Sequence, residues 1–93
     1  MAGFTTISST QLSANGDVFA GSARVKSIWV AHSATAGTVV LRDGGSTGTV
    51  RCTLNTAAVI GEYQSDIPEP GIRCDNPHIT IGGGVSFVTV FYD

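Results

Sequence analysis

The chain has 93 residues, of which 42% are hydrophobic and only 13% are charged, and its formal net charge is −2. This length fits one domain, and the composition is too apolar for a disordered chain. The five basic residues are scattered along the sequence, which argues against nucleic-acid binding, because phosphate contacts need a clustered basic face. No apolar run approaches the roughly 20 residues of a membrane span.

The first third of the chain predicts three strands. Residues 4–12 alternate Thr and Ser with other side chains, and residues 15–17 (NGD) give a strong turn signal. A short second strand is expected over residues 18–20. Residues 24–33 predict a third strand, and its segment 28–31 (IWVA) is apolar on both faces, which favours a central position in a sheet.

A β-hairpin is the clearest signal in the middle of the chain. Residues 34–37 (ATAG) predict a tight connection that leads into TVVLRDGGSTGTVRCTLN, residues 38–55. Its two arms, 38–42 and 49–54, alternate in polarity around a Gly-rich turn, so one face of the hairpin is expected to be core. The expected core-facing residues are Val39 and Leu41 on the first arm and Val50, Cys52 and Leu54 on the second.

The last third of the chain predicts several short strands and turns. Residues 56–66 are expected to form a short strand or a loop, because Gly61 interrupts the only apolar run that might start a helical turn. Residues 67–71 (IPEPG) predict a turn, since Pro fixes φ and Gly permits the reversal. The remaining expected elements are strands at 72–74, 78–81 and 85–92, with the last one central, and a flexible turn at Gly82, Gly83 and Gly84.

This spacing of short strands and turns predicts an all-β fold. We expect residues 1–93 to form a single small antiparallel β-sandwich, jelly-roll-like or immunoglobulin-like, of about eight strands without a substantial helix. The N-terminal MAGFTT has neither a basic stretch followed by an apolar one nor a glycine at position 2. No signal peptide and no myristoylation are therefore expected.

The cysteines and histidines are isolated from one another. Cys52 and Cys74 would allow one disulfide, but we expect two buried free thiols in a protein made in the cytosol. His32, His78 and the two cysteines lack the close pairs typical of zinc sites, so we expect no metal and no cofactor. Ser33 beside His32 is not accompanied by a nucleophile elbow or an oxyanion loop.

The other motifs in the sequence do not indicate a catalytic or ligand-binding site either. The carboxylates lie mostly in predicted turns, and the acidic positions of an EF-hand are missing. Neither Gly-rich segment ends in the GK[ST] of a phosphate-binding loop. The sequence therefore predicts no catalytic residues and no enzyme. Among the aromatic residues, Trp29 between Ile28 and Val30 is expected in the core, whereas Tyr63 and Tyr92 are the expected exposed platforms.

The order of several segments resembles a known family. The pieces that carry it are residues 26–33, 37–45, 48–56, 66–74 and 88–92. Together they are similar to the small β-rich virion structural proteins of tailed phages of marine bacteria, including cyanophages. The resemblance implies a non-enzymatic part of the virion, made in the bacterial host cytoplasm, with no catalytic residues to transfer.

Within that family, a capsid decoration (cement) protein is the expected role. Its partners would be the major capsid protein or other virion proteins, and a homo-oligomer is expected because so few charges protect the surface. Arg42, Arg51, Tyr63 and Tyr92 are the candidate interface residues. The alternatives are a tail, portal-vertex or fibre-associated protein, and a carbohydrate- or receptor-binding β module. No nucleic-acid or membrane partner is expected.

Overall fold

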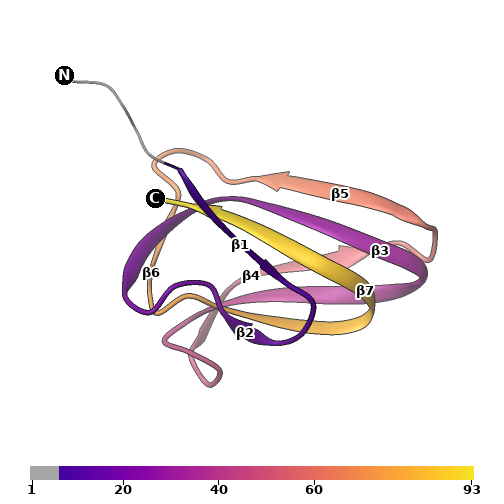
Figure 1. Cartoon of the computed structure of the whole chain (residues 1–93), viewed down its shortest axis with the longest axis horizontal. Coiled ribbons are helices and arrows are strands. Elements are labelled where there is room, and N and C mark those ends of the chain that lie inside the picture. The colour runs from indigo at the N-terminus through magenta and orange to yellow at the C-terminus, as the bar shows by residue number, and fades with distance from the viewer. Residues whose placement is uncertain (1–6) are drawn as a thin grey trace.

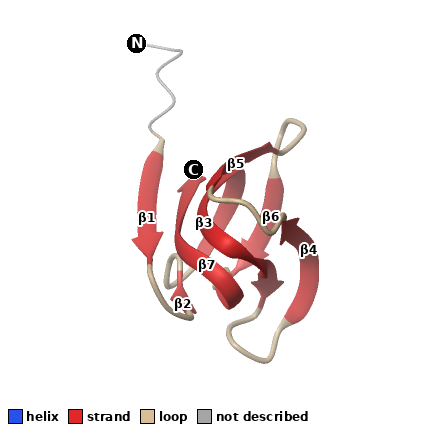
Figure 2. Ribbon diagram, turned by 90° about the vertical axis from the view of Figure 1, so that its right-hand side faces the viewer, coloured by secondary structure: helices blue, strands red, loops and turns tan. Residues whose placement is uncertain are grey.

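The computed structural model describes residues 7–93, which form seven β-strands and no helix (Figures 1 and 2). All strand pairs are antiparallel, and they belong to one sheet with β1, β7, β3 and β4 in that order. β2 pairs with β7, whereas β5 and β6 pair with β3. The strands are β1 (Ser8–Leu12), β2 (Gly16–Asp17), β3 (Ser22–Asp43), β4 (Thr49–Thr56), β5 (Gly61–Asp66), β6 (Ile72–Asp75) and β7 (His78–Tyr92).

Two long strands, β3 and β7, organise the whole domain. They pair over two stretches, and both strands bend between the pairs His32–Val85 and Gly37–Gly83. The first half of β3 carries β5 and β6, and the second half of β7 carries β1. Beyond the bend, β4 pairs with β3 and β2 pairs with β7. The bend in the paired strands β3 and β7 therefore folds one sheet back into two layers, which is the expected β-sandwich.

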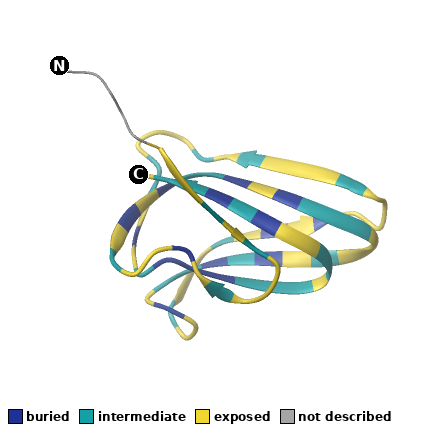
Figure 3. Ribbon diagram, in the orientation of Figure 1, coloured by how far each residue is buried: buried dark blue, intermediate teal, exposed yellow. Residues whose placement is uncertain are grey.

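The core lies between these two layers. Alternate residues are buried in each half of β3 and in the second half of β7 (Figure 3), as the period of two in a strand requires. Branched aliphatic side chains dominate because they pack well on a pleated surface. The buried cluster comprises Val18, Val25, Ile28, Val30, Val39, Leu41, Leu54, Cys74, Ile79, Val88 and Val90.

Glycines make the bend possible. Gly83 has a φ of 67°, and a Cβ placed there would lie 2.4 Å from the Ala36 carbonyl oxygen. At Gly84, a Cβ would lie 2.0 Å from the Thr35 carbonyl oxygen. The Ser33 hydroxyl donates a hydrogen bond to the Gly84 carbonyl oxygen at 3.1 Å. The two backbones thus approach each other at a distance that leaves no room for side chains.

The all-β class, the hairpin and the central positions of the long strands are confirmed. Two predicted connections are wrong. Residues 34–37 do not separate two strands but belong to β3, and Gly82, Gly83 and Gly84 do not form a hairpin turn but belong to β7. Each segment bends a strand that continues beyond it instead of reversing the chain, so seven strands are found instead of about eight.

Smaller differences concern element bounds. The second strand is Gly16–Asp17 instead of residues 18–20, and residues 56–66 contain β5. The predicted first strand is present from Ser8, and its residues 4–6 lie outside the described part of the chain. The predicted 72–74 strand is confirmed as β6, as is the turn before it, in which the Gly71 amide bonds the Pro68 carbonyl oxygen at 2.8 Å.

The hairpin contains a bulge that the sequence pattern did not indicate. Leu41 pairs with Cys52, but Arg42 pairs with Val50, so Arg51 has no partner in the register. Val50 consequently shares the outward face with Arg42 and is 49% exposed, whereas Leu54 remains buried. The prediction that Val50 faces the core is therefore wrong, because the extra residue of a bulge shifts the alternation that follows it.

Candidate functional site

The two candidate interface arginines mainly bond within their own hairpin. Arg42 is half-buried; its Nε lies 3.4 Å from Thr80 Oγ1 and its Nη1 donates to the Gly48 carbonyl oxygen at 3.2 Å. Arg51 is exposed, and its Nη1 lies 3.5 Å from Asp43 Oδ2. An exposed ion pair of this kind is weak, so Arg51 retains donors for an external contact, whereas Arg42 already uses two of its five N–H donors.

The two candidate tyrosines lie apart and in different settings. Tyr63 is 41% exposed on β5, opposite Val30 in the register. Tyr92 is half-buried at the end of β7, where its ring packs against Phe19 with centroids 5.5 Å apart. Only Tyr63 is thus the exposed aromatic residue that the sequence suggested, and the structure does not bring the four candidate residues together.

A different set of side chains forms the exposed aromatic surface. Trp29 is 45% exposed and Phe87 is 40% exposed, and the Trp29 ring meets Phe91 edge-on with centroids 5.7 Å apart. Trp29 pairs in the register with Gln64 on one side and Thr89 on the other. These residues share the outward side of the layer, because partners opposite each other in an antiparallel ladder point to the same face.

A cleft of about 250 Å³ lies on this surface. It is bordered by Trp29 on β3, by Phe87 and Thr89 on β7, and by Glu62, Tyr63 and Gln64 on β5. We call the outward set Trp29, Phe87, Phe91, Glu62, Gln64 and Thr89 the aromatic face. Tyr63 borders the cleft, but its register with Val30 assigns its side chain to the opposite side of the sheet. The aromatic face combines apolar rings with a few polar groups, as ligand and partner sites do.

The prediction that Trp29 is a core residue is wrong. Its neighbours Ile28 and Val30 are buried, and the period of two turns Trp29 to the other side of β3. An apolar run does mark a central strand, but within the described residues no second layer covers this outward face. A usable signal was present: in β7 the aromatic residues Phe87 and Phe91 alternate with buried Val88 and Val90, just as Trp29 alternates with Ile28 and Val30.

The remaining reactive side chains serve structural contacts. His78 is buried, with Nδ1 2.9 Å from Asp17 Oδ1, and His32 Nδ1 lies 3.4 Å from the Ser33 carbonyl oxygen. Within residues 7–93, no three His, Cys, Asp or Glu residues are grouped closely enough to hold a metal ion. That part of the chain also has no helix with the length and apolar character to span a membrane.

The two cysteines are free in the structure. Cys74 is fully buried in the core cluster, and Cys52 is half-buried. Burial raises the pKa of the Cys74 thiol, and the Asp43 carboxylate raises it further, while burial alone raises the pKa of Cys52. Because the thiolate is the nucleophile, raised pKa values make both side chains poor nucleophiles near neutral pH.

No protein-family model matches the chain, and no curated protein matches it. One solved structure is similar over 99% of this chain and 92% of its own, at 17% identity and a TM-score of 0.44. It belongs to the Bacillus endospore appendages, described as a novel family of disulfide-linked pili. A likeness of this strength supports no statement about what the present chain does.

Proposed function

We propose that this chain is a non-enzymatic structural protein of a phage virion, and that it is a capsid decoration protein that docks through its aromatic face. The proposal joins the resemblance of its strand-and-turn segments to virion proteins with one observation on the molecule. That observation is the outward exposure of Trp29 and Phe87 in the middle of a sheet. In soluble proteins, contiguous exposed apolar surface of this kind marks an interaction site.

The position of the aromatic face favours docking onto a protein. Trp29, Phe87 and Phe91 belong to the two strands that hold the core, so their backbones are fixed before a partner arrives. Aromatic residues are enriched in the centres of interfaces, and charged residues are depleted there. The polar groups Gln64 and Thr89 flank Trp29 in the register and would form the polar surroundings of such a contact.

The mechanism is passive. Each decoration protein buries its aromatic face against capsid subunits, and many symmetry-related copies multiply a contact of modest strength. Less than half of each ring is exposed, so covering Trp29 and Phe87 contributes about 1 kcal/mol each. A specific attachment needs about 1,600 Å² of buried surface in total, which a homo-oligomer on the capsid would provide more readily than a single small domain.

Binding of the purified protein to particles that lack it tests the proposal. The double variant Trp29→Ala, Phe87→Ala is expected to bind about 30-fold more weakly, because about 2 kcal/mol is lost. The matched control is Val59→Ala, Ile60→Ala, which removes two exposed apolar side chains outside the aromatic face. Equal binding by the double variant and the wild type would refute docking through this face.

Copy number separates the capsid from other virion locations. Hundreds of copies per particle are expected for a decoration protein, whereas a tail, portal-vertex or fibre protein is present in about a dozen copies or fewer. Light scattering measures the mass of the purified protein in solution and so tests the expected homo-oligomer.

A glycan-binding module is the second candidate, and the cleft beside Trp29 favours it. Sugar rings have apolar faces that stack on aromatic side chains, and Gln64, Glu62 and Thr89 offer hydrogen-bonding groups at the same cleft. Saturable binding on a glycan array that Trp29→Ala abolishes, together with unchanged particle binding by that variant, would favour this candidate over the capsid role.

A further inference from the structure

Two arginines lie directly opposite each other at the other end of the same layer. Arg24 on β3 pairs in the register with Arg73 on β6. Both side chains are exposed, and neither takes part in any ion pair of the described residues. Like charges directly opposite each other in a ladder destabilise a sheet. The pair is therefore a local cost to the fold that a bound anion would remove.

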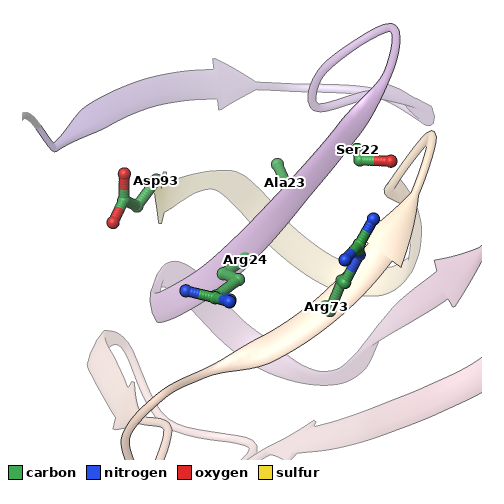
Figure 4. Close-up of a pocket in the computed structure, with 5 residues that line it drawn as sticks. All are labelled: Ser22, Ala23, Arg24, Arg73 and Asp93. Carbon is green, nitrogen blue, oxygen red and sulfur yellow. The ribbon is translucent and has the colours of Figure 1, made fainter.

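The surroundings of this pair form a small pocket (Figure 4). It has a volume of about 200 Å³ and is lined by Ser22, Ala23, Arg24, Arg73 and Asp93. The backbone of Asp93 holds β3 in place, because its N–H and carbonyl oxygen each bond the backbone of Arg24 at 2.9 Å. The pocket is thus lined by both arginines, and two backbone hydrogen bonds join Arg24 to Asp93 beside it.

The acidic groups nearby form no ion pair with the two guanidinium groups in the described part of the chain. The Ser22 hydroxyl donates a hydrogen bond to Asp75 Oδ1, and among the described residues that carboxylate forms no ion pair with Arg24 or Arg73. The Asp93 carboxylate forms no ion pair with Arg24 or Arg73 within the described part of the chain. In Figure 4 the Arg24 and Arg73 side chains come from the neighbouring strands β3 and β6.

We propose that this pocket binds one oxyanion, a carboxylate or a phosphate group, between Arg24 and Arg73. A guanidinium offers a planar fork of donors that matches either group. The pocket has room for one such group with some water, since a water molecule takes about 30 Å³. The source is either free phosphate in solution or an acidic side chain presented by a docked partner.

The second source connects the pocket to the aromatic face. Phe91 belongs to the aromatic face, and Asp93, two residues further along, lines the pocket. A protein that covers the aromatic face would thus come close enough to place a carboxylate at the arginine pair. The oxyanion site itself does not depend on the proposed function, because it rests on Arg24 and Arg73 alone.

Titration of the ¹⁵N-labelled protein tests the site, with orthophosphate and acetate as separate probes and sodium chloride holding the ionic strength constant. Saturable amide shifts are expected at residues 22–24, 73 and 93. Arg24→Gln and Arg73→Gln are each expected to weaken binding at least about tenfold. The matched control Arg51→Gln removes the same charge outside the pocket and is expected to leave binding unchanged.

The two probes distinguish the sources. Tighter binding of orthophosphate supports free phosphate as the ligand, and equal or tighter binding of acetate supports an acidic side chain. The proposal is overturned if neither probe gives saturable shifts, or if Arg51→Gln weakens binding as much as the pocket variants do. The same spectra show that each variant is folded, and failure of particle docking would not affect this result.

Discussion

Gly83→Ala tests the idea that the domain depends on the close approach of two bent strands. A Cβ at this position would lie 2.4 Å from the Ala36 carbonyl oxygen and 2.7 Å from the Gly37 Cα. Both distances are roughly 1 Å shorter than the optimal separation of about 3.5 Å for such atoms. The φ of 67° adds a second cost, because residues with a Cβ disfavour the left-handed region.

The expected loss follows from these two terms. The left-handed conformation costs about 1–2 kcal/mol, and overpacking against backbone costs about 1–3 kcal/mol. Together they lower the free energy of unfolding by about 2–5 kcal/mol, a large share of the roughly 5–14 kcal/mol typical of a chain this long. The melting temperature is expected to fall by about 10 °C or more.

Urea and thermal unfolding followed by far-UV circular dichroism measure this loss. Gly61→Ala is the matched control, since it adds the same methyl group to a strand where the nearest atoms, in the His32 ring, lie 3.7 Å away. That variant is expected to stay within about 1 kcal/mol of the wild type. If Gly83→Ala proves as stable as Gly61→Ala, the close packing at the bend does not hold the layers together.

Three further predictions concern the core and its polar groups. Leu41→Ala, at a fully buried position, is expected to cost about 2–5 kcal/mol in urea unfolding; a loss below 1 kcal/mol would contradict a core shared by both layers. Thr56→Val is expected to cost about 1–3 kcal/mol in the same assay. It removes the Oγ1 that accepts from the Gly37 amide at 2.9 Å, so an unchanged midpoint would show that this bond is dispensable. For Cys74, burial raises the folded-state pKa above its ordinary value of 9.0. Its contribution to stability is therefore complete below about pH 9 and is lost as the pH rises further, because only the unfolded state then releases the proton. Urea midpoints measured at rising pH should fall more for the wild type than for Cys74→Ala, and equal slopes would count against a buried neutral thiol.

Sequence patterns predicted those features of the fold that depend on residues close together in the chain. Alternation in the arms 38–42 and 49–54, with glycines between them, led correctly to a hairpin and to Val39 and Leu41 as core residues. The bulge at Arg51 was not predictable, because a single extra residue is defined only by its partner strand. The bends were missed for the same reason. Gly-rich segments permit either a reversal or a bend, and the choice depends on which strands pair.

The candidate site residues could likewise be predicted only in part from the sequence. Arg42 and Arg51 are candidates because they are charged residues on an outward face, but Arg42 already bonds Thr80 on β7 and the Gly48 carbonyl oxygen in its own hairpin. The apolar neighbours of Trp29 favour a core position for it, although the period of two separates it from Ile28 and Val30. What the sequence could not supply is which outward face of a central strand stays uncovered, since that depends on the number of layers.

The construction of the fold bears on how tightly the aromatic face can bind. Trp29 sits between two core residues of β3, and Phe87 and Phe91 alternate with core residues of β7. Packing of Ile28, Val30, Val88 and Val90 therefore fixes the backbone positions of the outward rings. A partner that covers these rings orders few additional groups, so little of the binding energy is lost to conformational entropy. By this reasoning, core substitutions that loosen β3 against β7 should weaken partner binding even though they leave every residue of the aromatic face in place.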